Sequence, residues 1–216
     1  MPRRLSMLVI ALATLAAGGV LLGASGVRSA ADDAAASRVT PEQALAAFDT
    51  VQAVLQHPRC QNCHIPGDAP LQLDSGQTHL QNALRGPDGR GVPGLPCSTC
   101  HAAANPPDSY GAHTPPGAPN WHLPPPDRKM VFIGLSKADL CATIKDPRRN
   151  GGKNAAGLLA HVDHDALVLW GWHPGVGRKP VSIPHDEFVQ SMKTWIDGGM
   201  PCPAPSAASS SSGAMR

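Results

Sequence analysis

The chain is poor in aromatic side chains. Its 216 residues include one Tyr, three Phe and four Trp, whereas Gly and Pro number 22 and 23. A chain with so many turn-forming residues and so few large apolar ones buries little side-chain surface when it folds. We therefore expect a non-protein group to fill part of the core.

The chain also lacks an excess of either charge. Residues 1–31 hold three of the 18 basic residues and none of the 16 acidic ones, so the remainder is close to neutral. Nucleic-acid binding needs a concentrated basic face. A nucleic-acid partner is therefore not expected.

Long apolar runs are scarce as well, and only Leu5–Leu22 approaches the ~18 residues of a membrane-spanning helix. Arg3 and Arg4 precede this run, and the small residues Ser29–Ala31 follow it. That order is typical of a cleaved secretory signal peptide. The alternative is a single retained N-terminal anchor. The sequence thus predicts a periplasmic protein with a signal peptide (1–31), a linker (32–40), one domain (41–203) and a disordered Ser/Ala-rich tail (204–216).

Helix signals are separated by irregular segments, which predicts a mainly α, loop-rich fold. Capping boxes begin at Thr40 and Ser136, and apolar residues at helical spacing follow each of them. Helices are expected at 41–57 and 136–144, after these capping boxes, and also at 158–172 and 186–197, with a short one at 77–84. Residues 104–127 contain eight prolines and cannot be regular. This segment carries Trp121 and His122, so we expect it to wrap around a rigid group rather than serve as a linker.

The chain contains C-x-x-C-H twice, as Cys60–His64 and Cys97–His101. This is the attachment signature of c-type haem. Two thiols three residues apart can add to the two vinyl groups of one haem, and the following imidazole can then bind its iron. The motifs predict two covalently bound haems c, attached through Cys60 and Cys63 and through Cys97 and Cys100, with His64 and His101 as iron ligands.

Other uses of the cysteine pairs fit less well. Zinc ribbons usually separate their pairs by about 15–20 residues, whereas 33 residues lie between Cys63 and Cys97. A thioredoxin-like pair needs a βαβ pattern, and disulfides alone leave the histidine after each pair unexplained. Because the two motifs are too close for two tandem cytochrome domains, one domain should hold both haems.

The sixth iron ligands are less evident, and the candidates are histidines and methionines outside the motifs. In order of preference they are Met130, His79, His164 and His122, followed by His113, His161, His173 and Met200. Met130 lies in a short apolar run after the Pro-rich segment, where core packing is the alternative role. A Met ligand would raise the potential, and a second His would lower it.

Cys141 and Cys202 remain after the haem motifs are assigned. In an oxidising compartment two such cysteines usually form a disulfide. Closing a loop of about 60 residues would stabilise the fold by ~4 kcal/mol on the chain-entropy model. Two buried thiols are the alternative.

The chain resembles a family of proteobacterial secreted proteins labelled "isoquinoline 1-oxidoreductase subunit". The resemblance covers residues 41–203 and rests on the blocks His57–His64, Arg85–Gly89, Cys97–His101, Lys145–Pro147, Asn150–Gly152, Trp170–Gly175 and Trp195–Asp197. It implies a partnership with a molybdenum hydroxylase, whose electrons this chain would pass towards the respiratory chain.

Two hypotheses of function follow. The first is an electron carrier in which both irons have six ligands. The second is a haem enzyme, such as a peroxidase or small-molecule reductase, in which one iron keeps an open position. No distal catalytic group stands out in the sequence, which favours the carrier.

Overall fold

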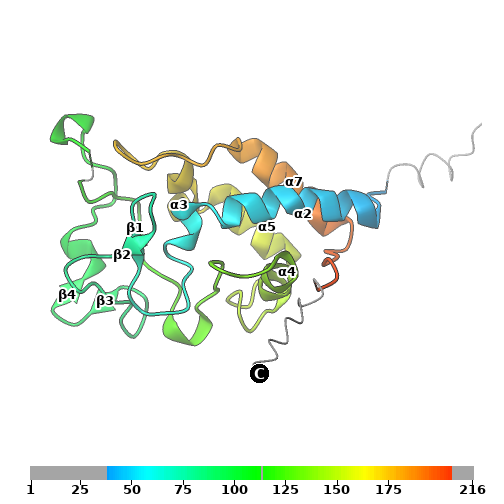
Figure 1. Cartoon of the computed structure of the whole chain (residues 1–216), viewed down its shortest axis with the longest axis horizontal. Coiled ribbons are helices and arrows are strands. Elements are labelled where there is room, and N and C mark those ends of the chain that lie inside the picture. Colours follow the sequence, from blue (N-terminus) through cyan, green and yellow to red (C-terminus); the bar gives the residue numbers. More distant parts are fainter. Residues whose placement is uncertain (1–37, 113, 206–216) are drawn as a thin grey trace, which may run out of the picture. The chain divides into compact units, whose positions relative to one another are not determined.

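The computed structural model describes residues 38–112 and 114–205, and the compact unit begins at Arg38. The signal peptide, most of the linker, His113 and most of the tail lie outside the described residues. Within them the fold is mainly helical and loop-rich with a few short strands (Figure 1), as the sequence predicts. No helix in this part of the chain has the length and hydropathy to span a bilayer.

The helices gather in one half of the unit (Figure 1). They are α2 (Pro41–Leu55), α3 (Pro58–Gln61), α4 (Lys137–Lys145), α5 (Ala155–His164), α6 (Ala166–Leu169) and α7 (His185–Asp197), with a 3-10 turn at Trp170–Trp172. The predicted cap of α2 is present: the Thr40 hydroxyl accepts a hydrogen bond from the Gln43 N–H, and the Gln43 side chain accepts one from the Thr40 N–H. Ser136 caps α4 by accepting a bond from the Asp139 N–H.

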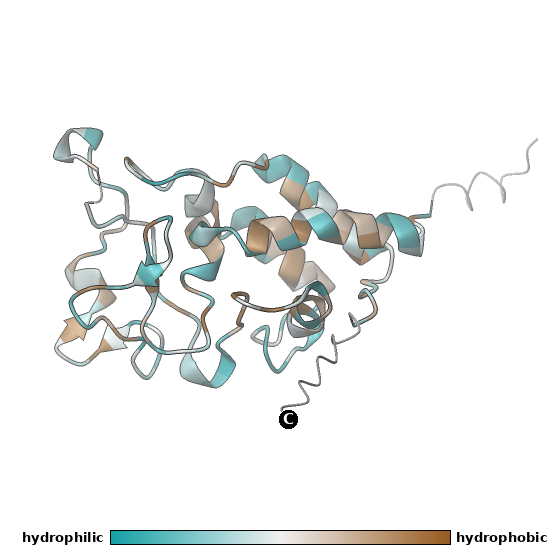
Figure 2. Cartoon of the chain, viewed as in Figure 1, coloured by the Kyte–Doolittle hydropathy of each residue, from teal (hydrophilic) through white to brown (hydrophobic). Residues whose placement is uncertain are grey.

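The core of the helical half lies between α2 and α7. Phe48 of α2 and Trp195 of α7 are fully buried, and their ring centroids are 5.0 Å apart. Apolar residues run along α2 and α5 (Figure 2), and α4 contributes Leu140 and Ile144 to the same cluster. One continuous apolar core therefore supports this half.

The other half consists of turns and two-residue strands. Strand β1 (Leu71–Gln72) pairs antiparallel with β2 (Gln77–Thr78), and β3 (Gly91–Val92) pairs with β4 (Leu95–Pro96). The helix predicted for residues 77–84 is wrong. Its first residues form β2, and Gln81 and Asn82 both have positive φ (61° and 52°), a left-handed conformation that a right-handed helix cannot include.

The Pro-rich segment is irregular, as predicted, with only 3-10 turns at Asp108–Tyr110 and Pro126–Arg128 among its described residues. It packs closely on the β-hairpin half. The Leu123 N–H donates to the Gly89 carbonyl at 2.8 Å. A Cβ atom at Gly89 would lie 2.0 Å from the Leu123 oxygen, so this approach of two backbones requires glycine.

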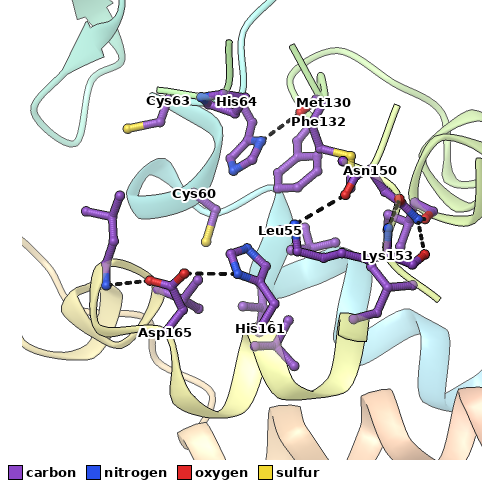
Figure 3. A pocket seen from close by; sticks show the side chains of 18 of the residues that line it. Leu55, Cys60, Cys63, His64, Met130, Phe132, Asn150, Lys153, His161 and Asp165 are labelled. Atoms are coloured by element: carbon purple, nitrogen blue, oxygen red, sulfur yellow. Dashed lines mark hydrogen bonds and ion pairs between the residues drawn. The ribbon is translucent and has the colours of Figure 1, made fainter. Parts of the chain in front are cut away.

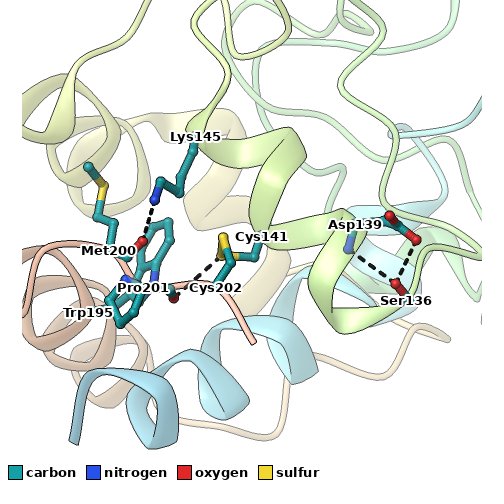
Figure 4. The surroundings of a disulfide bond; sticks show 8 residues. All are labelled: Ser136, Asp139, Cys141, Lys145, Trp195, Met200, Pro201 and Cys202. Atoms are coloured by element: carbon teal, nitrogen blue, oxygen red, sulfur yellow. Dashed lines mark hydrogen bonds between the residues drawn. A yellow bond between two sulfur atoms is a disulfide. The ribbon is translucent and has the colours of Figure 1, made fainter. Parts of the chain in front are cut away.

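Cys141 and Cys202 form a disulfide, which confirms that prediction (Figure 4). Their Cα atoms are 5.6 Å apart. The bond joins α4 to the chain that follows α7, where the Trp195 indole N–H donates to the Pro201 carbonyl at 3.0 Å. Lys145 donates to the Met200 carbonyl at 2.6 Å in the same place. The end of the folded unit is thus fixed to the core.

Candidate functional site

The first motif forms a single helical turn at the end of α3. His57 caps this turn by accepting a bond from the Arg59 N–H. The Cys63 and His64 N–H groups both donate to the Cys60 carbonyl at 3.2 Å. Because residues three apart in such a turn share one face, both thiols are presented on the same side and His64 follows directly.

One ring nitrogen of His64 forms a hydrogen bond with the protein, and the other remains available to a ligand. Its Nδ1 lies 2.7 Å from the Met130 carbonyl oxygen (Figure 3). Since a carbonyl only accepts, Nδ1 must carry the proton and Nε2 retains its lone pair. The ring also stacks on Phe132 with centroids 3.9 Å apart. Burial lowers the pKa of His64 to about 4, which keeps the imidazole neutral as a metal ligand requires.

Beside this turn lies a cavity of about 380 Å³, within the range of about 300–1,000 Å³ that is usual for ligand sites. Both thiols and His64 line it, together with apolar side chains from α2, α5 and α7 (Figure 3). The cations on its wall are Arg59, next to Cys60, and Arg128, Arg149 and Lys153. In Figure 3, Cys60 and Cys63 lie on one side of the pocket and Lys153 on the other. A largely apolar ligand that carries anionic groups fits this lining.

The two thiols of the first motif are poorly suited to ionise. Burial raises the pKa of Cys60 to about 12 and is the main reason that the pKa of Cys63 rises to about 11. The Cys97 thiol of the second motif adds to the rise at Cys63, so the two motifs are neighbours in space. Both thiols are therefore in their neutral form in these surroundings.

His161 of α5 reaches the same cavity from another element (Figure 3). Its Nδ1 lies 3.1 Å from Oδ2 of Asp165, the residue one helical turn later. A carboxylate accepts, so Nε2 of His161 also keeps its lone pair. Burial lowers the pKa of His161. His64 and His161 are therefore two imidazoles on one cavity, and burial lowers the pKa of each.

The second motif repeats the arrangement of the first on a different scaffold. A 3-10 turn, Cys97–Thr99, brings the Cys100 and His101 N–H groups to the Cys97 carbonyl at 3.2 and 2.9 Å. Nδ1 of His101 lies 2.8 Å from the Pro116 carbonyl. Its Nε2 is again the nitrogen left for a metal. Here, however, Cys100 is exposed.

His79 faces His101 across the second motif. Its Nδ1 lies 2.7 Å from the Leu80 carbonyl, and the two ring centroids are 6.1 Å apart. An imidazole nitrogen binds a transition metal at about 2.0–2.1 Å, and the ring centre lies about 1 Å beyond that nitrogen. Two imidazoles on one metal thus have centres about 6 Å apart. The separation of His79 and His101 suits a shared iron.

Trp121 lies between the two sites. Its ring is parallel to that of His101, with centroids 4.4 Å apart and an interplanar angle of 4°. It also meets Trp170 edge-on at 5.0 Å, and both indoles line the cavity of the first motif. The Pro-rich segment therefore contacts His101 of the second motif and lines the cavity beside the first.

Of the four preferred sixth ligands, the structure places His79 near the second motif and Met130 and His122 on the cavity of the first, and it leaves His164 apart. Met130 lines the first cavity, but its carbonyl is held by Nδ1 of His64, which places its backbone on the same side as that histidine. His164 does not line the cavity; its side chain is 77% exposed and lies 3.3 Å from Asp163. His122, which belongs to neither motif, also lines the cavity.

Sequence reasoning gave too little weight to three features. His161 stood low among the candidates, although its i,i+4 spacing from Asp165 is a usable signal. Arg59 and Arg85, next to the first motif, are buried charges with no sequence signature. Arg85 is fully buried and donates to the carbonyls of Ile65 and Gly67 at 3.2 and 2.9 Å and to that of Pro124. It thereby joins the chain after the first motif to the Pro-rich segment.

Comparison with known proteins identifies no relative: no family model, curated protein or solved structure matches the chain. Among the residues that the structure describes, no three or more His, Cys, Asp or Glu side chains are grouped to hold a metal ion. A haem iron needs only one or two protein ligands, because the porphyrin supplies the others. The site must be interpreted from its own geometry.

Proposed function

We propose that the chain is a periplasmic di-haem c-type cytochrome that carries electrons. One haem would be attached at Cys60 and Cys63 in the cavity. The other would be attached at Cys97 and Cys100, near the surface. When bound, each haem supplies an iron that accepts one electron, passing from ferric to ferrous, and releases it again.

The observation that carries the proposal is the shared state of the two motif histidines. His64 and His101 each direct Nδ1 to a carbonyl, 66 and 15 residues away in the sequence. Bonds of this kind fix the tautomer and the orientation of a metal-binding imidazole. Two unrelated local structures, a helix end and a loop, present the same arrangement next to two thiols. Core packing alone would not require both motif histidines to make this bond.

We assign His161 as a second residue that would hold the first iron together with His64, and His79 as a second residue that would hold the second iron together with His101. His161 shares the cavity with His64, and the separation of His79 and His101 accommodates one metal. These ligands replace Met130 as the preferred assignment. With both positions filled, the irons have no open site, which favours a carrier over a haem enzyme. Two histidines per iron also imply low potentials.

The direction of transfer rests on the family resemblance. In that view a molybdenum hydroxylase oxidises its substrate and reduces this protein, which then reduces an acceptor redox protein of the respiratory chain. Electrons would enter and leave through the second haem, since its motif has the exposed cysteine. Trp121 and Trp170 lie between the two attachment sites.

Haem content tests the proposal directly. Protein matured in a periplasm with a cytochrome c assembly system should carry two haems by pyridine haemochrome and by intact mass. The double variant Cys60→Ala/Cys63→Ala should carry one. As a control, Cys141→Ala/Cys202→Ala should still carry two. No covalent haem, or bound zinc without a Soret band, would overturn the proposal.

Spin state tests the ligands. The ferric protein should be low-spin at both irons, without the weak red charge-transfer band of Met-ligated haem. A high-spin signal at one iron would favour the haem enzyme instead. A red charge-transfer band in the wild type would instead restore Met130 as a ligand.

A further inference from the structure

The four proposed iron ligands differ in what holds their Nδ1 atoms. His64, His79 and His101 each face a backbone carbonyl, at 2.7, 2.7 and 2.8 Å. His161 alone among these four faces a carboxylate, Oδ2 of Asp165 at 3.1 Å. The charged partner therefore belongs to the first site only.

Asp165 is itself held in place. It is the N-cap of α6, and its Oδ1 accepts a hydrogen bond from the Leu167 N–H at 2.9 Å. Its other oxygen is thereby directed to His161, which lies one helical turn earlier in α5. Asp165 also lines the cavity (Figure 3). One oxygen orders the helix start and the other orients the imidazole.

A carboxylate that accepts the Nδ1 proton makes an imidazole more electron-donating than a neutral carbonyl does. A stronger donor stabilises ferric iron more than ferrous iron, and so lowers the reduction potential. We propose that Asp165 is a positioning residue that lowers the potential of the first haem through His161, while the second haem has no equivalent. This inference rests on the proposed function.

The test is a redox titration of Asp165→Asn, in which the two one-electron steps are resolved. Asn keeps the size of Asp and is as good a helix cap. It has one acceptor oxygen and an NH2 group in place of the other, so the variant loses the charge together with the hydrogen bond that one of the two oxygens accepts. We expect the ferric-to-ferrous ratio of the first haem at a fixed potential to fall about tenfold, a shift of about 59 mV upward. The step of the second haem should not move.

The chain offers a matched control. Asp163→Asn removes a carboxylate near the end of α5, the helix that carries His161. This carboxylate lies 3.3 Å from Nε2 of the exposed His164. Neither step should move in this variant. Repeating the Asp165→Asn titration in a Cys97→Ala/Cys100→Ala background, which removes the second haem, assigns the shifted step to the first.

Three results would overturn the inference. In Asp165→Asn, the reduction potentials of both haems could stay unchanged, or that of the first haem could fall. The potentials of both haems could also rise equally, which would indicate only a loss of net charge. If Asp165→Asn fails to accumulate, Asp165→Ser, which also supplies a capping oxygen, must shift the same step upward. If the wild-type protein carries two low-spin haems but Asp165→Asn shifts neither potential, this inference is refuted and the proposed function stands. Protein without haem refutes the proposed function as well.

Discussion

The two C-x-x-C-H motifs have the same spacing but are held by different kinds of structure. The first follows α3 and lines a cavity of about 380 Å³ whose walls include the buried core residues Phe188 and Met192. The second lies on a 3-10 turn among hairpins and prolines, and its Cys100 is exposed. Haem potentials depend on burial and second-shell bonding as well as on axial ligands. If each motif holds a haem, as proposed, the two centres should therefore differ in character.

Removing each attachment site in turn gives the largest expected effect. Loss of the first haem in Cys60→Ala/Cys63→Ala leaves an apolar cavity against the main core. Deleting one large buried side chain already costs about 2–5 kcal/mol, and a domain has only about 5–15 kcal/mol of stability. We therefore expect this variant to keep the second haem but to lose a large part of its free energy of unfolding.

The matching variant, Cys97→Ala/Cys100→Ala, should remain folded, because the second site contributes little to the core. Urea denaturation of both variants measures the difference. Equal loss of stability in the two variants would show that the second site is as much a part of the core as the first.

The disulfide belongs to the helical half and sharpens the same comparison. Cys141→Ser/Cys202→Ser opens a loop whose ends are 61 residues apart in the sequence, and the chain-entropy model gives a loss of about 4 kcal/mol. We expect the urea midpoint to fall while both low-spin haem spectra persist. Loss of the second haem's spectrum would contradict the view that the disulfide supports the helical half.

The sequence predicted the helical half better than the loop half. Thr40 and Ser136 begin helices through short-range capping, and the spacing of apolar residues is a local signal, so α2, α4 and α7 lie close to their expected positions. Residues 77–84 carry no such signal. Their conformation depends on pairing with Leu71–Gln72 and on positive φ at Gln81 and Asn82, which a helical pattern does not reveal.

The candidate site divides in the same way. The motifs identify the four thiols and two histidines from covalent spacing alone. The partners of His64 and His101, the carbonyls of Met130 and Pro116, are backbone groups that any residue could supply. The opposite ligands depend on how distant segments pack. Sequence position therefore could not rank His161 above Met130.

Met130→Ala separates these two roles. We expect a loss of about 1–3 kcal/mol from packing because Met130 is a partly buried member of the core cluster. Its carbonyl, which His64 uses, is unchanged by the substitution. The haem spectra and both potentials should therefore stay as in the wild type. A fall in one potential would instead assign the thioether to iron.

His79→Ala should affect the second site and leave the first unchanged. Apart from the proposed bond to iron, His79 bonds to the carbonyl of its neighbour Leu80, so we expect the main effect at the second iron and not in the packing of the core. One of the two ferric haems should become high-spin by EPR. His164→Ala, at an exposed position, should leave both low-spin. If His164→Ala changes the spin state and His79→Ala does not, the assignment of the second iron is wrong.

The smallest expected effect concerns Trp121, which contacts both sites and so tests whether they are independent. Its indole is parallel to His101 at 4.4 Å, and with Pro116 it limits rotation of that imidazole. Trp121→Leu removes the stacked ring, worth about 0.5–1.5 kcal/mol beyond its buried area, but keeps the bond from Nδ1 to Pro116. One low-spin EPR signal, that of the second haem, should broaden or shift as the plane of His101 becomes less defined relative to His79. Trp172→Leu is the control: its indole packs on His185 and Phe188 in the helical half, with centroids 4.7 and 5.7 Å away. That variant should perturb the first haem and leave the second signal sharp. If both variants perturb both signals, the two halves form one cooperative unit, and the difference between an enclosed and an exposed centre lies in solvent access alone.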